Sequence, residues 1–296
     1  MQRKLVKQGA ATLMISLPSK WIQKNALDKG DEISLYEENE NLIISKSGKK
    51  EEIQKATLDV SDLHPLINRA LIALYIKGMD EIEVVFSNKN EIKDFSKKIL
   101  PELLGFEIIK QTSSSIVLRD ITGCEKQEVD SLIKRIILIL DSIAEEIING
   151  VENKQALNSA IEADISVNRL TNFCLRILNK KDYIISSKKP QIYGLLNLLE
   201  EIGDNYKKIA QFIDKNPKLI NKKHLLCLQE SRELLKYYNE LIFNFNREKV
   251  VECSRKYKKL KEELNTKSVI DIYIYELLMS IIRINNYLLV YSLGKE

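Results

Sequence analysis

The stretch TLMISLPSKWIQKNALDKGDEI, residues 12–33, holds the signals that decide how this chain begins to fold. With the period of a β-strand, Leu13, Ile15 and Leu17 fall on one face of residues 12–17 and Met14 and Ser16 on the other. Pro18 suits the first turn of a helix, because its missing N–H leaves no helical hydrogen bond unmade there. That helix is expected to end near Asn25, and Gly30 then turns the chain into another strand.

Around this stretch, the first 46 residues predict a small unit of four strands and one helix in the order ββαββ. The predicted strands cover residues 3–8, 12–17, 32–37 and 42–45. A unit of this size cannot bury a hydrophobic core by itself. We therefore expect it to fold as a homodimer.

Positive charge gathers before the first acidic residue, Asp28. The net charge of the 296-residue chain is only +4, so any basic surface must be local. Such a segment favours contact with a polyanion such as DNA, although solubilising lysines are the ordinary alternative. Arg3 is the best candidate for reading base edges, and phosphate contacts would supply most of the affinity. The candidate DNA-binding residues are Arg3, Lys4, Lys7, Gln8, Lys20 and Lys24.

After a polar linker at residues 47–50, the pattern predicts two further regions. Strands at 54–60, 80–86, 106–111 and 115–120, with helices at 62–78 and 91–104, predict a small α/β region of order βαβαββ. Helical spacing then predicts six helices at 126–149, 152–180, 189–214, 220–246, 248–264 and 267–293. They read as two three-helix bundles with a weak internal duplication. The predicted fold class is multidomain α+β, with domains at 1–46, 51–122 and 125–296.

Several function classes find no support in the residues. The four cysteines, Cys124, Cys174, Cys227 and Cys253, lie far apart and are expected to be buried thiols in a reducing, cytoplasmic compartment. No apolar run is long enough to span a membrane. No phosphate-binding loop or catalytic triad is visible, so we expect no enzyme. His64 and His224 have no ligand partners at metal-binding spacing and are expected to be structural or surface residues.

The opening stretch resembles AbrB/MazE/SpoVT-type DNA-binding domains, which carry a strand, an xxPKxW motif and a GLKxGDxV motif. The matching positions are Pro18, Lys20, Trp21, Leu27, Gly30, Asp31 and Ile33. The resemblance implies a swapped-hairpin fold, in which two chains intertwine as a homodimer that binds DNA.

A second resemblance lies in LLNLLEEIGDNYKKIAQFI, residues 195–213, and NSAIEADISVNRLTNF, residues 158–173. Both segments resemble helices of PhoU proteins, which are regulators linked to phosphate uptake. The combination with an AbrB-like head resembles archaeal phosphate-uptake regulators.

The PhoU resemblance implies one site for a divalent or an iron- or zinc-type metal. Its candidate ligands are Asp164, Glu200 and Asp204, with Asn168 at a position where the family usually has a carboxylate. Glu200 and Asp204 are four residues apart and share a helix face, as carboxylates that hold one ion must. The alternative is an ordinary solvated face of a helix rich in lysine and glutamate.

Together these features predict a cytoplasmic, dimeric transcriptional regulator that binds DNA and is linked to phosphate homeostasis. The main alternative is a signalling adaptor whose helical body binds a phosphate transporter or kinase and whose head serves only for dimerisation. An antitoxin is a third class, and the long folded body argues against it.

Overall fold

The computed structural model of the chain describes residues 2–9, 12–38, 41–46, 53–92, 95, 99–123, 128–180, 189–264 and 268–292. Its contacts divide the chain into two compact units, Met1–Glu52 and Ile53–Glu296. We call the first the head and the second the body. Each is described by itself.

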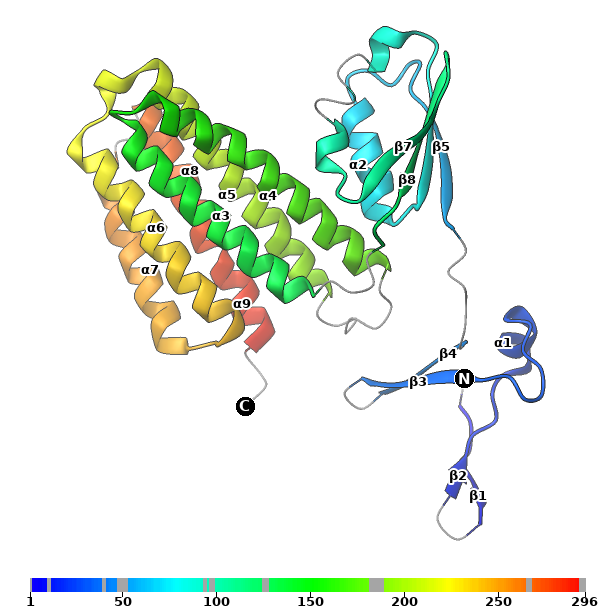
Figure 1. The fold of residues 1–296 in the computed structure, drawn as a ribbon. Helices are drawn as coiled ribbons and strands as arrows, with labels where there is room; N and C mark the ends of the chain where they lie inside the picture. Colours follow the sequence, from blue (N-terminus) through cyan, green and yellow to red (C-terminus); the bar gives the residue numbers. More distant parts are fainter. Residues whose placement is uncertain are drawn as a thin grey trace. The chain divides into compact units, whose positions relative to one another are not determined.

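The head contains two separate hairpins and one short helix, in the predicted order ββαββ (Figure 1). Strand β1 (Val6–Gln8) pairs antiparallel with β2 (Thr12–Met14), and β3 (Ile33–Glu38) pairs antiparallel with β4 (Asn41–Lys46). The first hairpin is shorter than predicted. Helix α1 (Ser19–Lys24) begins one residue later than predicted, with Pro18 at its N-cap, where the Pro18 carbonyl accepts the N–H groups of Trp21 and Ile22.

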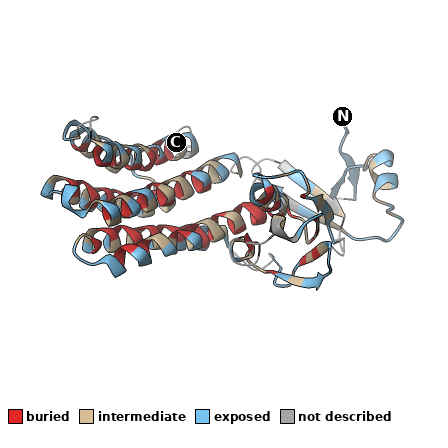
Figure 2. Cartoon of the chain, turned by 90° about the horizontal axis from the view of Figure 1, so that it is seen from above, coloured by how far each residue is buried: buried red, intermediate tan, exposed pale blue. Residues whose placement is uncertain are grey.

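The described residues of the head include none that is buried, as Figure 2 shows by the absence of red. Several large apolar side chains are exposed instead: Leu5, Val6, Leu13, Met14, Ile15, Leu35, Leu42 and Ile43. A folded unit normally covers such residues, because each one removed from water contributes about 1.5–3 kcal/mol.

The body begins with a four-stranded sheet, which we call with its helix the α/β module. Its strands are β5 (Lys55–Asp59), β6 (Glu81–Val85), β7 (Phe106–Gln111) and β8 (Ser115–Asp120), in the spatial order β5-β6-β8-β7. The pair β5 and β6 is parallel, as the connecting helix α2 (Ile67–Lys77) requires, and the other pairs are antiparallel. Inward residues such as Ile82, Val84 and Leu118 are buried, and outward residues alternate with them.

The predicted helix of the module at residues 91–104 falls partly outside the described residues, and its described residues Phe95 and Ile99 lie in a π-helical turn. Short 3₁₀ helices at Lys89–Ile92 (η1) and Leu100–Glu102 (η3) stand near its two ends, and residues 93–94 and 96–98 lie outside the described part. Pro101 lies in the first turn of η3, where its missing N–H leaves no helical hydrogen bond unmade.

The rest of the body is a bundle of antiparallel helices. They are α3 (Val129–Gly150), α4 (Lys154–Lys180), α5 (Lys189–Lys215), α6 (Lys222–Phe243), α7 (Arg247–Glu262), α8 (Val269–Ile282) and α9 (Ile284–Ser292). The last two correct the predicted single helix at 267–293, because α8 ends at Ile282 and Arg283, whose φ of −62° and ψ of −18° remain in the right-handed helical region, is a turn residue between it and α9. The interruption is slight, since the Arg283 N–H still donates to the Met279 carbonyl at 3.2 Å.

Helices α3, α4 and α5 pack against one another, and α6, α7 and α8 form a second group (Figure 1). The two groups join where α3 meets α6 and where α5 meets α8. The β-rich start, the small sheet and the helical C-terminal region confirm the predicted order of architectures. The predicted boundaries of three domains stay a prediction. Among the described residues, no helix is both long and apolar enough to cross a membrane.

Candidate functional site

The six candidate DNA-binding residues all have exposed side chains in the head. Arg3 and Lys4 precede β1, Lys7 and Gln8 lie on it, and Lys20 and Lys24 stand one turn apart on α1. In the described part of the chain, none of the five cations forms an ion pair. Their charges are therefore available to phosphates, and their role in DNA binding stays a prediction.

The first hairpin mixes these cations with uncovered apolar residues. In the antiparallel register Lys7 lies opposite Leu13, and Val6 lies opposite Met14. Alternate residues of a strand point to opposite faces, so both faces of this hairpin carry exposed apolar side chains. A two-stranded hairpin is marginally stable in water, and this one has no covering element within the head.

In the body, the structure brings the four predicted metal ligands to one place between α4 and α5. Asp164 on α4 is fully buried, and its Oδ2 accepts a hydrogen bond from Asn168 Nδ2 at 3.5 Å. Glu200 and Asp204 approach it from α5, close enough that each carboxyl group disfavours the charge on its neighbours. Burial and then the Asp204 and Asp164 charges raise the pKa of Glu200 to about 7.

Sequence reasoning missed two members of this group. Glu102, from η3 in the α/β module, adds another carboxyl group, and burial followed by the Asp164 charge raises its pKa. Lys207 on α5 places its Nζ 2.7 Å from Asp164 Oδ2. Burial lowers the pKa of Lys207, but the bond to Asp164 and the neighbouring carboxylates raise it further, so the net shift is upward. We call Glu102, Asp164, Glu200, Asp204 and Lys207 the carboxylate cluster.

In the part of the chain that the structure describes, the carboxylate cluster has one feature of a metal site but lacks the ligand arrangement of one. Asp164 Oδ1 and Asn168 Oδ1 are buried oxygens without a hydrogen-bond partner, as unfilled metal ligands would be. Within the described residues, however, no three side chains of the metal-binding types are placed to share one ion, and Lys207 already neutralises Asp164. As arranged here, the group does not fit a metal ion, and the metal-ligand role of the four residues stays a prediction.

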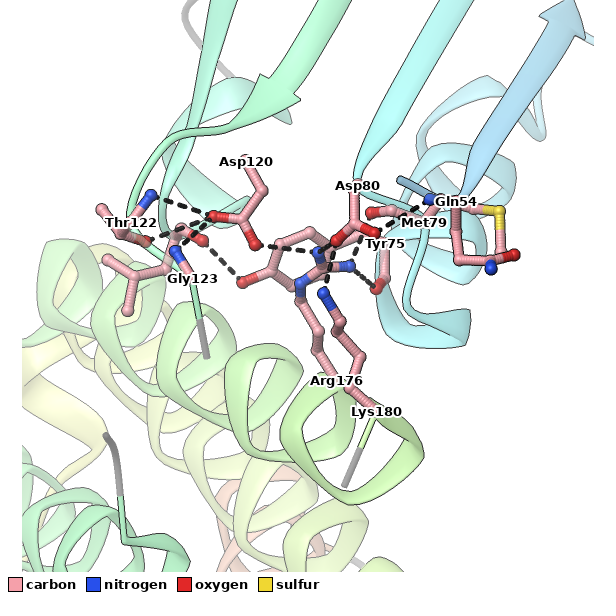
Figure 3. Close-up of polar contacts among 10 residues, drawn as sticks. Gln54, Tyr75, Met79, Asp80, Asp120, Thr122, Gly123, Arg176 and Lys180 are labelled. Atoms are coloured by element: carbon pink, nitrogen blue, oxygen red, sulfur yellow. Dashed lines mark hydrogen bonds and ion pairs between the residues drawn. The ribbon is translucent and has the colours of Figure 1, made fainter. Parts of the chain in front are cut away.

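A second polar centre joins α4 to the α/β module (Figure 3). The Arg176 side chain, fully buried, donates to the Tyr75 carbonyl at 2.9 Å and to the Met79 carbonyl at 2.7 Å. It also donates to Asp80 Oδ1 at 3.1 Å and Asp120 Oδ2 at 2.9 Å. Two aromatic rings flank the guanidinium group, each with its centroid 5.0 Å away.

The two carboxylates of this centre have further donors. Asp80 also binds Lys180, one turn after Arg176, and its Oδ2 accepts the Gln54 N–H at 3.0 Å. Burial acts to raise the pKa of Asp120, but hydrogen bonds from Arg176 and from the Gly123 N–H keep it below the ordinary value. These charge-assisted hydrogen bonds hold the module to the bundle, and each of them joins two residues of this chain.

The remaining polar groups have structural explanations. His64 is exposed, and His224 is buried, where its Nδ1 accepts the Asn221 N–H at the start of α6 and its Nε2 lies 3.2 Å from Asp271 Oδ1. Cys174, Cys227 and Cys253 are buried free thiols, as predicted, and burial raises the pKa of each. Cys124 lies outside the described residues.

A surface pocket of about 360 Å³ lies between α5 and α8, with the hydrogen-bonded pair Asn205 and Ser280 among its lining residues. Two cations and two carboxylates also line it: Glu201, Lys208, Glu276 and Arg283. Because these charges balance, the pocket favours no one class of charged ligand.

Comparison with known proteins identifies the head alone. Residues 6–52 match the family described as "Antidote-toxin recognition MazE, bacterial antitoxin". No curated protein and no solved structure matches the chain. The matched segment spans both hairpins and α1, including the proline, tryptophan and glycine positions of the opening stretch. Residues 6–52 of this chain are therefore a MazE/AbrB-type domain.

Proposed function

We propose that this protein is a DNA-binding transcriptional regulator whose head works as a homodimer. The observation that carries the proposal is the match of residues 6–52 to the MazE family, in a head whose described residues bury nothing. A second copy of the hairpins would cover the exposed apolar side chains, and MazE/AbrB-type domains typically dimerise and bind DNA. The body would supply the signal that controls binding.

DNA contact in this proposal rests on the unpaired cations of the head. Each phosphate that a cation neutralises releases a counterion, which adds about 0.9 to the slope of log affinity against log salt concentration. Replacing Arg3, Lys4 and Lys7 together by alanine should weaken binding and lower that slope by about 2–3 units. The fold should not change, since these side chains are exposed and form no ion pair with the residues that the structure describes.

The experiment uses the full chain and an operator found by crosslinking the protein to genomic DNA. Binding is measured by fluorescence anisotropy over a series of salt concentrations. A variant with alanine at Lys218, Lys222 and Lys258, all exposed on the body, is the control because it removes the same charge. If the head variant binds operator DNA with the affinity and salt slope of the parent, the head does not contact DNA. A signalling adaptor, whose head serves only for dimerisation, would then replace this proposal.

The link to phosphate uptake rests on the resemblance of residues 158–173 and 195–213 to PhoU helices. Crosslinking with and without phosphate limitation tests it directly. Occupancy that does not respond to phosphate would leave a DNA-binding regulator with another signal. A phosphate transporter or kinase that purifies with the body would favour the adaptor.

An antitoxin-like regulator is the second candidate, because the matching family is described as a bacterial antitoxin. In that case the partner would be a toxin protein. The folded body of residues 53–296 distinguishes the two, since a toxin-neutralising segment is usually a short disordered tail. Release from growth arrest when the chain is expressed with a captured toxin would support this candidate.

A further inference from the structure

The carboxylate cluster gathers four carboxyl groups from three elements, and one of them is entirely shielded from water. Asp164 has none of its surface exposed, and it lies between α4 and α5 with η3 nearby. Burying a carboxylate without a positive partner is strongly unfavourable. The cluster therefore requires a cation, and the identity of that cation decides what the body responds to.

We propose that the Lys207 ammonium group is the resident cation of the carboxylate cluster, and that a divalent metal ion enters only when this group is removed. Lys207 Nζ lies 2.7 Å from Asp164 Oδ2, within the range of a charge-assisted hydrogen bond. The lysine is on α5, three residues after Asp204, so helical spacing places the two on one face.

The ammonium group leaves part of the coordination capacity of the cluster unused. Among the described residues, Asp164 Oδ1 and Asn168 Oδ1 have no hydrogen-bond partner, although both atoms are buried. Gly203 allows α5 to approach this place, since a Cβ there would lie 3.3 Å from Asp164 Oδ1. These are one carboxylate oxygen and one amide oxygen, and both are of the kinds that hard divalent cations prefer as ligands.

The same geometry provides an entry path once the lysine is shortened or neutralised. The Lys207 side chain is 33% exposed, whereas the Asp164 side chain is 1% exposed. The lysine thus extends from solvent to the buried carboxylate. Removing its charge leaves Asp164 facing a route to solvent, with Glu200, Asp204 and Glu102 close by.

The next residue along α5 is a matched control. Lys208 is exposed, and its Nζ contacts the Asn205 side-chain oxygen at 3.3 Å rather than a carboxylate of the cluster. Lys207→Met and Lys208→Met remove the same charge from neighbouring positions of one helix. Both lysines lower the pKa of Asp204 through their charge, but only Lys207 bonds to Asp164, so only the first substitution should leave the buried carboxylate without its partner.

The test compares the full chain with both variants, purified without chelators, by elemental analysis and by thermal unfolding with added Mn²⁺ or Mg²⁺. We expect the parent and Lys208→Met to contain no metal and to show no change in Tm. Lys207→Met should melt about 5 °C or more below the parent, because a buried carboxylate loses its partner. Mn²⁺ should then bind at one site per chain and raise the Tm in proportion to the logarithm of its concentration.

A second substitution locates the ion. Asp164→Asn combined with Lys207→Met replaces the buried pair by neutral groups, so the double variant should regain thermal stability without metal and lose Mn²⁺ binding. Lys207→Gln, which replaces the charge by an uncharged hydrogen-bond donor, is the further variant if Lys207→Met does not fold, and it is expressed with and without Mn²⁺. Recovery of folded protein only with Mn²⁺ supports the proposal.

Three results would overturn the assignment. One is a stoichiometric metal ion in the parent protein, since the ion and not Lys207 would then be the resident cation. Another is a folded Lys207→Met variant that melts like the parent and binds no Mn²⁺. The third is that Lys207→Gln does not fold with or without Mn²⁺ and that the double variant Asp164→Asn, Lys207→Met does not fold either. None of these results bears on DNA binding by the head.

Discussion

Replacing Arg176 by methionine removes the charge that joins the α/β module to helix α4 and keeps a long, flexible side chain. Asp120, whose side chain is 5% exposed, would then rely on the N–H groups of Thr122 and Gly123. Asp80 would keep Lys180, and two backbone carbonyl groups would lose their donors. Breaking a buried ion pair in this way costs about 3–5 kcal/mol.

We therefore expect the free energy of unfolding of the body to fall by about 3–5 kcal/mol at neutral pH. For a region of this size, that loss lowers the Tm by about 6–20 °C. Urea unfolding followed by far-UV circular dichroism measures the helical body. Trp21 is the single tryptophan and lies in the head, so its fluorescence follows the head separately and should not change.

The effect should also depend on pH. Because the folded pKa of Asp120 is held low, its contribution to stability is present above its unfolded pKa of about 3.9 and is lost as the pH falls through the folded pKa. Without Arg176, burial raises that pKa, and protonation then stabilises the folded variant. The difference in the free energy of unfolding between the parent and Arg176→Met should therefore become smaller in acid.

Lys180→Met is the control, since Asp80 would retain Arg176. Lys180→Met should lower the free energy of unfolding by less, about 1–2 kcal/mol. A variant at Arg176 that unfolds at the same urea concentration as the parent would refute the reasoning. So would a stability difference that stays constant from neutral pH into acid.

Three smaller predictions follow from local geometry. Burial holds the pKa of His224 below 6.5 against the attraction of Asp271. The free energy of unfolding should therefore have its full value above that pH and decrease as the pH drops below it. Urea midpoints across this range test the decrease, which His224→Gln should remove. Gly105→Ala should destabilise the α/β module by about 2 kcal/mol or more, because φ is +87° and a Cβ would meet Thr122 Oγ1 at 2.2 Å. Asn246→Ala should lower the free energy of unfolding by about 1 kcal/mol, since its side chain caps α7; an unchanged urea midpoint would contradict this.

The order of elements was predictable because each segment carries its own local signal. Strands β7 and β8 were predicted at residues 106–111 and 115–120, and the structure has these bounds. Burial alternates along β8, where Ile116 and Leu118 are buried, and such a period-2 pattern depends on one strand and one covered face. In β7 only Phe106 is buried, so the alternation does not explain that prediction. The interruption at Arg283 was not predicted, because the apolar pattern continues through it into α9.

The polar centres were harder to predict, because their members are far apart along the chain. Glu102 joins Asp164 from a different structural layer, and nothing near residue 102 marks it. Arg176 had one usable signal. It lies in the run LTNFCLRIL, residues 170–178, in which only Asn172 escapes burial. A helix that is apolar on all sides is buried, and a charged residue within it must find a partner.

The Gln54 N–H that ends on Asp80 has a mechanical consequence. Gln54 lies two residues beyond the end of the head, and the strand that follows it, β5, is an edge strand paired only with β6. Tension arriving along the connecting chain would otherwise peel β5 from the sheet one hydrogen bond at a time. Because Asp80 also binds Arg176 and Lys180 of helix α4, a pulling force on Gln54 would be shared with that helix. Part of the force would then be carried by α4 rather than by the hydrogen bonds between β5 and β6.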